Sequence, residues 1–265
     1  MQRIVFADSW SGFFAGFNLK SFDDLYGNPA VKTIGVNKKR NIVTFSLGSD
    51  SHKKRFFMKR FCHPYFKDML FSWRNIGRPC SQARYEWENA RLLLDNGIET
   101  YRSVCFGEKI SCGIERNSFF VTKELQFQCL TDFVRQNWAG FKRRQKEKVI
   151  TGIAEFVRKI HALNISLPDL YVWHIYITEN AAGEYDYAVI DLHRMSRNVT
   201  STSRKIKNLG RLHYSMLDSY FDEGLKHLLV KSYFADSGDG DVTKFFAKIK
   251  KYSRAVNTRR VPIQY

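Results

Sequence analysis

Two apolar runs separated by a polar turn stand out in the middle of the chain. Residues 172–178 and 185–190 are rich in β-branched and aromatic side chains, and residues 179–184 between them supply Asn and Gly. This pattern predicts a β-hairpin, because strands favour such side chains and turns favour Asn and Gly. Asp169 precedes the first run and Asp191 closes the second, so the hairpin should carry one carboxylate at each edge.

The first half of the chain is predicted to be mainly β-structure. Apolar residues at helical spacing predict one helix over residues 81–96, ended by Gly97. Residues 1–30 mix aromatic, Gly and polar residues, and we expect an irregular cap over this half, with lipid contact of the aromatic side chains as the alternative. Strands are predicted from apolar runs at residues 31–36, 41–47, 55–61, 104–106 and 119–125.

The second half is predicted to be mostly helical around the hairpin. Its apolar positions recur at the spacing of one helix face. Helices are expected at residues 129–138, 141–163, from about residue 204 onward, 221–234 and 242–254.

One lysine and one glutamate of the first half are predicted to form a buried ion pair. The two-residue period of the strand at 55–61 places Lys59 on the same face as two phenylalanines. Glu86 lies on a helix face that is otherwise apolar. A buried carboxylate is costly unless it is paired, so we expect Lys59 to bind Glu86, with a surface-edge ion pair as the alternative.

The composition is typical of a single two-lobed unit in a reducing compartment. The chain has 265 residues, of which 44% are hydrophobic, and this is enough for a sizeable core. Its five cysteines form no C-x-x-C pair and follow no apolar leader, so a cytoplasmic location is expected. No segment approaches the roughly 18 apolar residues of a spanning helix, and any membrane contact should be peripheral.

A net charge of +17 predicts attraction to an anionic partner, which could be nucleic acid, an acidic protein or an anionic membrane face. Aromatic residues are not regularly interleaved with the basic runs, and this disfavours nucleic acid. The strongest candidate for an anion-binding surface is the C-terminal segment with Lys244, Lys248, Lys250, Lys251, Arg254, Arg259 and Arg260.

Two short motifs at the hairpin resemble a known family. His174 follows Asp169 at the fifth position, which is the offset in the kinase pattern H-R-D-L-x-x-x-N. The segments Leu-Pro-Asp-Leu-Tyr-Val-Trp-His-Ile (167–175) and Val-Ile-Asp-Leu-His-Arg (189–194) resemble the bacterial lipopolysaccharide inner-core sugar kinases, namely the WaaP-type heptose kinases and the related Kdo kinases. The resemblance implies an α+β, bilobal protein-kinase-like fold.

The resemblance also implies a division into lobes and a reaction. A small β-rich N-lobe would span residues 1–124, and a larger helical C-lobe residues 125–265. The reaction would transfer the γ-phosphoryl group of ATP to a heptose of the lipopolysaccharide core. Asp169 would accept the hydroxyl proton and Asp191 would hold Mg²⁺.

Other residues would assist these two carboxylates in such a kinase. Lys59, fixed by Glu86, would hold the α- and β-phosphates of ATP, and the backbone near Glu124 would hold adenine in the linker between lobes. His174 would bind a second metal weakly or orient Asp169 or a phosphate. The remaining candidates, for contact with the acceptor, are His193 and Arg194.

The sequence departs from the family at Leu167-Pro168, where His-Arg is usual. Either the rigid Pro168 gives Asp169 the same orientation and the kinase is active, or the protein is a catalytically impaired kinase-fold binding protein. Retention of the two acids and of the lysine–glutamate pair favours activity. A Kdo kinase or another small-molecule phosphotransferase is the alternative for the acceptor.

The partners expected from the resemblance are anionic. They are the lipopolysaccharide core or lipid A precursor and the anionic inner face of the inner membrane, and an acidic protein is a further candidate.

Overall fold

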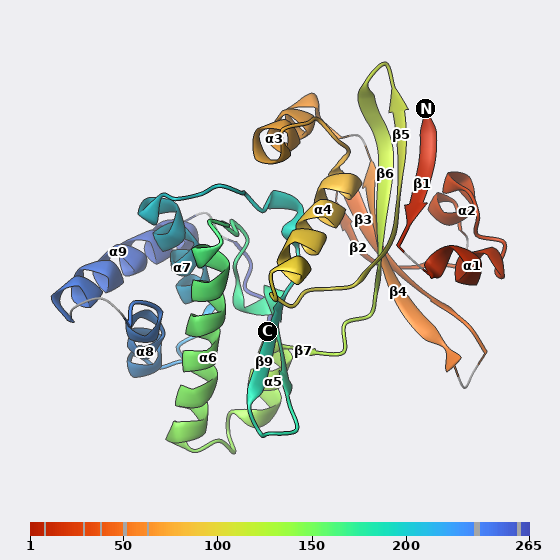
Figure 1. The fold of residues 1–265 in the computed structure, drawn as a ribbon. Helices are drawn as coiled ribbons and strands as arrows, with labels where there is room; N and C mark the ends of the chain where they lie inside the picture. Colours follow the sequence, from red (N-terminus) through yellow and green to blue (C-terminus); the bar gives the residue numbers. More distant parts are fainter. Residues whose placement is uncertain are drawn as a thin grey trace. The chain divides into compact units, whose positions relative to one another are not determined.

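The structure is a computed structural model, and it describes residues 1–265 except 8, 29, 38, 50, 51, 63, 236–238, 259 and 260. The chain divides into two compact units (Figure 1). Unit 1 comprises Met1–Asn96 and Thr100–Leu125, and unit 2 comprises Gly97–Glu99 and Gln126–Tyr265. Two basic residues predicted to meet an anionic surface, Arg259 and Arg260, lie outside the described residues.

A six-stranded antiparallel sheet forms the centre of unit 1. Its order is β1-β5-β6-β4-β3-β2, so β4 lies inside the sheet between β3 and β6. The strands predicted from apolar runs are confirmed, and β5 and β6 extend further than predicted to form a long hairpin. The strands are β1 (Gln2–Phe6), β2 (Lys32–Asn37), β3 (Arg40–Leu47), β4 (Lys54–Cys62), β5 (Ser103–Ser111) and β6 (Ile114–Lys123).

The first thirty residues are more regular than we expected. Strand β1 pairs with β5 at the sheet edge, and the short helices α1 (Trp10–Ala15) and α2 (Phe22–Tyr26) follow it. Phe14 and Phe22 of these helices are buried in the core of unit 1. The prediction of an irregular segment was therefore wrong, and these two aromatic side chains serve the core and not a lipid contact.

Two helices of unit 1 follow β4 in the chain. Helix α4 (Gln82–Asp95) confirms the predicted helix, because the Ser81 hydroxyl caps its first turn and Gly97 takes a left-handed φ of 69° beyond its end. Helix α3 (Phe66–Ile76) was not predicted. Its apolar residues nevertheless recur at helical spacing, and Phe66, Leu70 and Trp73 among them are exposed.

Unit 2 consists of helices around a three-stranded sheet of order β7-β8-β9. The predicted hairpin is confirmed as β8–β9, and the five predicted helices are present within a few residues of their expected bounds. Helix α7 contacts α9, and α6 contacts α8 (Figure 1). The elements are β7 (Gln128–Cys129), β8 (Ile175–Glu179), β9 (Tyr185–Val189), α5 (Leu130–Asn137), α6 (Arg143–Ala162), α7 (Thr202–Ser215), α8 (Glu223–Tyr233) and α9 (Asp239–Asn257).

The end of α6 is fixed by a buried histidine. His161 Nδ1 lies 2.7 Å from the Tyr233 hydroxyl, and Nε2 lies 3.2 Å from Asn208 Oδ1. Burial lowers the pKa of His161 to about 4, so the ring is neutral at physiological pH. A neutral ring can accept from the tyrosine and donate to the amide oxygen, which satisfies both nitrogens and sets the point from which the chain leaves α6.

No helix in the described part of the chain combines the length and the apolar character needed to cross a bilayer.

Candidate active site

Two backbone ties hold the segments that carry Asp169 and Asp191 next to each other in unit 2. Before Asp169, Ser166 and Ser196 exchange two backbone hydrogen bonds of 2.9 Å. Beyond it, the Ile190 amide donates to the His174 carbonyl at 3.0 Å, next to the β8–β9 pairing. The two acids therefore lie between two fixed points, one on each side.

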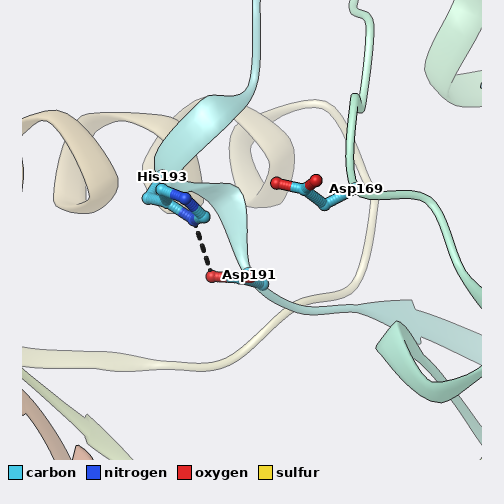
Figure 2. A group of neighbouring side chains, drawn as sticks. All are labelled: Asp169, Asp191 and His193. Atoms are coloured by element: carbon cyan, nitrogen blue, oxygen red, sulfur yellow. Dashed lines mark hydrogen bonds and ion pairs between the residues drawn. The ribbon is translucent and has the colours of Figure 1, made fainter. Parts of the chain in front are cut away.

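Asp169, Asp191 and His193 converge on one small volume (Figure 2). One ligand atom from each residue lies within 4.8 Å of the others. Figure 2 shows Asp169 on the loop after α6, and Asp191 and His193 on the short segment that follows β9. The structure thus brings together the two carboxylates that the sequence placed at opposite edges of the hairpin.

His193 orients one of these carboxylates. Its Nδ1 lies 2.8 Å from Asp191 Oδ1, and a carboxylate oxygen can only accept this hydrogen bond, so Nδ1 carries the proton. Asp191 itself has a left-handed backbone with φ 63° and ψ 62°, which short polar side chains such as Asp tolerate best. The strained backbone and the imidazole together fix where the carboxylate points.

His174 bridges the two acid segments. Its Nδ1 lies 2.7 Å from the Asp169 carbonyl oxygen, which again can only accept, and its Nε2 lies 4.0 Å from Asp191 Oδ2. In the neutral ring the Nε2 lone pair is therefore directed to the Asp191 side. His174 thus braces the backbone of Asp169 and offers one nitrogen near Asp191.

Asp169 has a basic neighbourhood of its own. Arg194 Nη1 donates to Asp169 Oδ1 at 3.0 Å. Burial raises the pKa of the nearby Tyr171 hydroxyl, and the Asp169 carboxylate adds to this, whereas Arg211 and Arg194 oppose it. Arg194 thus contacts Asp169 directly, and the carboxylate and Arg211 both lie near the Tyr171 hydroxyl.

The loop that lacks the family's His-Arg pair has another anchor. Leu167 is buried with 3% of its surface exposed, and its backbone N–H donates to Asn208 Oδ1 at 3.0 Å. The Ser166 hydroxyl donates to the same oxygen at 2.9 Å. Asn208 on α7 thus supplies the brace, a role that the sequence did not reveal, although a polar residue beside the buried positions of a helix was the available signal.

The predicted ion pair in unit 1 is present between β4 and α4. Lys59 Nζ lies 2.7 Å from Glu86 Oε1, with 13% and 1% of the two side chains exposed. The Tyr101 hydroxyl also donates to Glu86 Oε1 at 2.7 Å, a contact that the sequence did not predict. The buried carboxylate therefore has a cation and a neutral donor on one oxygen, and Lys59 is fixed on its strand.

Glu124 lies near the end of unit 1, and both its backbone N–H and its carboxylate are hydrogen-bonded to Arg55 of β4. Its backbone N–H donates to the Arg55 carbonyl at 3.0 Å, and its side chain accepts from Arg55 Nη1 at 3.1 Å. A ligand contact from the Glu124 backbone would therefore use its carbonyl oxygen.

These donor atoms have the chemistry of a magnesium site beside a base. Mg²⁺ prefers oxygen ligands, and two of the three convergent side chains are carboxylates, so the residues present fit that ion. The imidazole of His193 fits an orienting role better, because its Nδ1 proton already binds Asp191.

Comparison with known proteins identifies the family of this chain. The model of the lipopolysaccharide kinase (Kdo/WaaP) family matches residues 30–233. The lipopolysaccharide core heptose(I) kinase WaaP of Pseudomonas aeruginosa is 29% identical over 162 residues, which are 59% of this chain and 60% of that protein. The Escherichia coli enzyme of the same name is 28% identical over 212 residues, 77% of this chain and 80% of the relative.

The fold is shared with a solved structure. WaaP in complex with acyl carrier protein superimposes with a TM-score of 0.70 at 21% identity, covering 94% of this chain and 99% of that one. The kinase-like α+β fold expected from the sequence is thereby confirmed. Because the family model covers well over half of the sequence, the chain belongs to the lipopolysaccharide kinase (Kdo/WaaP) family.

Proposed function

We propose that the protein transfers the γ-phosphoryl group of ATP to a heptose hydroxyl of the lipopolysaccharide core. The observation that carries this proposal is the convergence of Asp169 and Asp191 between two backbone ties. Family membership and the heptose(I) kinase names of the relatives support the choice of acceptor.

Asp169 acts as the general base in this proposal. Its carboxylate accepts the proton of the attacking hydroxyl, and the His174 contact to its carbonyl holds the loop in place. Arg194 binds Asp169 Oδ1 and positions the carboxylate, so that the second oxygen is directed to the acceptor.

Asp191 is the proposed metal ligand, held in position by His193. Mg²⁺ bound there would neutralise charge on the transferred phosphates. His174 Nε2, 4.0 Å from Asp191 Oδ2, would hold the outer side of the same site by a hydrogen bond or as a weak ligand.

Lys59 binds the α- and β-phosphates in the proposal. Glu86 and the hydrogen bond from Tyr101 to that carboxylate limit where the lysine can lie. Such a fixed cation contributes to catalysis by positioning the nucleotide, because phosphoryl transfer depends mainly on orientation and charge stabilisation. The Glu124 carbonyl is the proposed adenine contact.

The basic neighbourhood of Asp169 suits an anionic acceptor. Arg194 and Arg211 lie near the Tyr171 hydroxyl, where they can bind phosphate or carboxylate groups beside the reacting sugar. The inner core of lipopolysaccharide is such an acceptor, and we propose that the enzyme meets it at the cytoplasmic face of the inner membrane.

An acidic protein is a further proposed partner. The net charge of +17 favours one, and the structural relative is in complex with acyl carrier protein. Exposed lysines on α9 of unit 2, including Lys248 and Lys251, are candidates for this contact or for an anionic lipid.

Labelled ATP tests the acceptor directly. The protein is incubated with γ-labelled ATP, MgCl₂ and either a core that carries heptose or a truncated core that ends before it. We expect label only on the heptose-bearing core. Label on both cores would move the acceptor to Kdo, and label on neither would contradict the proposed activity.

A further inference from the structure

Helix α3 of unit 1 exposes an apolar face to solvent. Phe66, Leu70 and Trp73 recur at the spacing of one helix face, and 61%, 39% and 54% of their surfaces are exposed. Tyr65, directly before the helix, is 52% exposed. Scattered apolar residues on a surface are ordinary, but three large ones here share one face of an eleven-residue helix, and Tyr65 precedes them.

The opposite face anchors the helix to the rest of unit 1. Met69 and Ser72 are buried, and the Ser72 hydroxyl donates to the Met69 carbonyl and accepts from the Cys80 N–H. Phe71 also makes an edge contact with Tyr85 of α4 at 5.6 Å between ring centroids. Figure 1 shows α3 beside α4, so the outward direction of the apolar face follows from fixed contacts on its inner side.

Basic residues border this face. Lys67 and Arg74 are exposed on the flank of the Phe66–Leu70–Trp73 stripe. Lys39 places its Nζ 3.3 Å from the Tyr65 ring centroid. Asp68 is the acidic residue of the helix, and it is engaged by the Tyr65 backbone N–H at 3.0 Å in the first turn. The apolar face is therefore bordered by positive charge.

We propose that α3 docks the protein on an anionic phospholipid surface, with Phe66, Leu70 and Trp73 inserted among the acyl chains and Lys67 and Arg74 on the phosphates. Helices of this composition lie in the plane of a bilayer interface, where aromatic side chains are favoured and basic residues bind anionic lipids. The inference extends the proposed function, since a kinase of a lipid-linked acceptor gains from being held at the surface that contains it.

Co-sedimentation with vesicles tests the docking without ATP or acceptor. The probe is vesicles of phosphatidylethanolamine and phosphatidylglycerol, compared with vesicles of phosphatidylcholine alone. Phe66→Ser/Trp73→Ser should weaken binding to the anionic vesicles by at least about tenfold, because two inserted apolar side chains are lost. The matched control Ile34→Ser/Val36→Ser removes two exposed apolar residues of β2 and should bind as wild type does.

Quenching by lipids brominated on their acyl chains tests insertion at one residue. Tryptophan fluorescence of the wild type should fall on binding, and most of this change should be lost in Trp73→Phe. The control Trp10→Phe changes a partly buried tryptophan that packs against the core of unit 1 and should keep the quenching. Reversing the flanking charges, Lys67→Glu/Arg74→Glu, should weaken binding to anionic vesicles more than any residual binding to phosphatidylcholine.

Each outcome decides for or against the docking. Equal vesicle binding by wild type and Phe66→Ser/Trp73→Ser would overturn it. A change from dimer to monomer in that variant, without vesicle binding by the wild type, would reassign the face to a second copy of the chain. Loss of acyl carrier protein binding alone would reassign it to a protein partner. Phosphoryl transfer to a deacylated, water-soluble core tests the kinase proposal separately and should be unchanged in the α3 variants.

Discussion

At the scale of single residues, each acid of the site has its own basic partner. Arg194 binds Asp169 and His193 binds Asp191, and the acceptor contacts that the sequence suggested for both stay a prediction. The two bonds constrain the carboxylates before any ligand arrives, which reduces the ordering needed when the nucleotide and the acceptor bind. His174 adds a third constraint through the Asp169 carbonyl.

Two substitutions of His174 distinguish its hydrogen bond to the Asp169 carbonyl from the proposed role of Nε2 at the metal site. His174→Asn keeps a side-chain N–H that can reach the Asp169 carbonyl, so Mg²⁺-dependent transfer should stay within a few-fold of wild type. His174→Ala removes the donor, and kcat should fall by about 10- to 100-fold, as for other residues that support a metal site. Steady-state kinetics of both variants measures this, and complete loss of transfer in His174→Asn would instead assign the imidazole an indispensable ligand role.

Removal of the Lys59 charge should destabilise the protein through Glu86. Lys59→Met leaves a carboxylate that is 1% exposed without its cation, and the free energy of unfolding should fall by about 3 kcal/mol or more. Urea denaturation measures this change. The double variant Lys59→Met/Glu86→Gln should recover most of the stability, because the glutamine oxygen still accepts from Tyr101, while phosphoryl transfer stays low. A Lys59→Met variant as stable as the wild type would contradict the claim that Glu86 depends on the lysine for its burial.

Sequence reasoning identified the residues with a fixed local pattern and missed those that act at a distance. Sequence alone could predict the spacing of Asp169 and His174 and the strand end at Asp191, because residues close along the chain determine both. Asn208 reaches the Leu167 amide and Tyr101 reaches Glu86 only through the tertiary fold. The sequence can show that such a residue is polar beside buried positions, but it does not show which group the side chain meets.

At the scale of elements, the N-terminus of α4 is anchored by two buried acids from the β5–β6 hairpin. Glu115 accepts from the Gln82 N–H at 3.0 Å, and Glu108 accepts from the Ser81 hydroxyl. Carboxylates are favoured at a helix N-terminus by its unpaired N–H groups and its dipole. Because α4 carries Glu86, this anchor also determines where the lysine–glutamate pair lies.

The pH dependence of stability should report on Glu115. Burial, helped by Glu108 and Asp68, raises the pKa of Glu115 from 4.5 to about 7, against the opposing hydrogen bonds from Ser118 and Gln82. The folded state then binds the proton more tightly than the unfolded state. The contribution of Glu115 to the free energy of unfolding is therefore complete below pH 4.5 and is lost as the pH rises through 7.

Glu115→Gln removes the titrating carboxyl group, so this variant is the reference against which the wild type is compared. The difference in unfolding free energy between wild type and variant, measured by urea denaturation at a series of pH values, should change steadily across that interval. The buried histidines His161 and His213, whose pKa values burial lowers to about 4, titrate in both proteins and cancel in the difference. Parallel profiles for the two proteins would show that Glu115 has an ordinary pKa in the fold.

Helices and strands could be predicted where one face of the segment is buried and the other is exposed to solvent. Helix α6 has such a pattern, whereas the β8–β9 hairpin was marked by two apolar runs around a turn, and both were predicted within a few residues of their bounds. Strand β1 is a short edge strand without a one-sided signal, whereas helix α3 was missed although its apolar residues recur at helical spacing.

At the scale of the whole molecule, charge and family membership agree. A net charge of +17 suits an enzyme whose nucleotide, acceptor and proposed membrane surface are all anionic, because the field of the protein raises their local concentration. Neither the charge nor the fold selects the acceptor by itself, since kinase-like folds serve many substrates. The choice of heptose depends on the family and on the names of the relatives in it.

The most direct test of this account is the rate of phosphoryl transfer to a heptose-bearing core in wild type, Asp169→Asn and Asp191→Asn, with circular dichroism to establish that all three are folded. We predict that loss of the base lowers kcat by about 10²- to 10⁴-fold and that loss of the metal-side carboxylate abolishes the dependence on Mg²⁺ together with the activity. A folded Asp169→Asn protein that transfers phosphate at the wild-type rate would contradict the account.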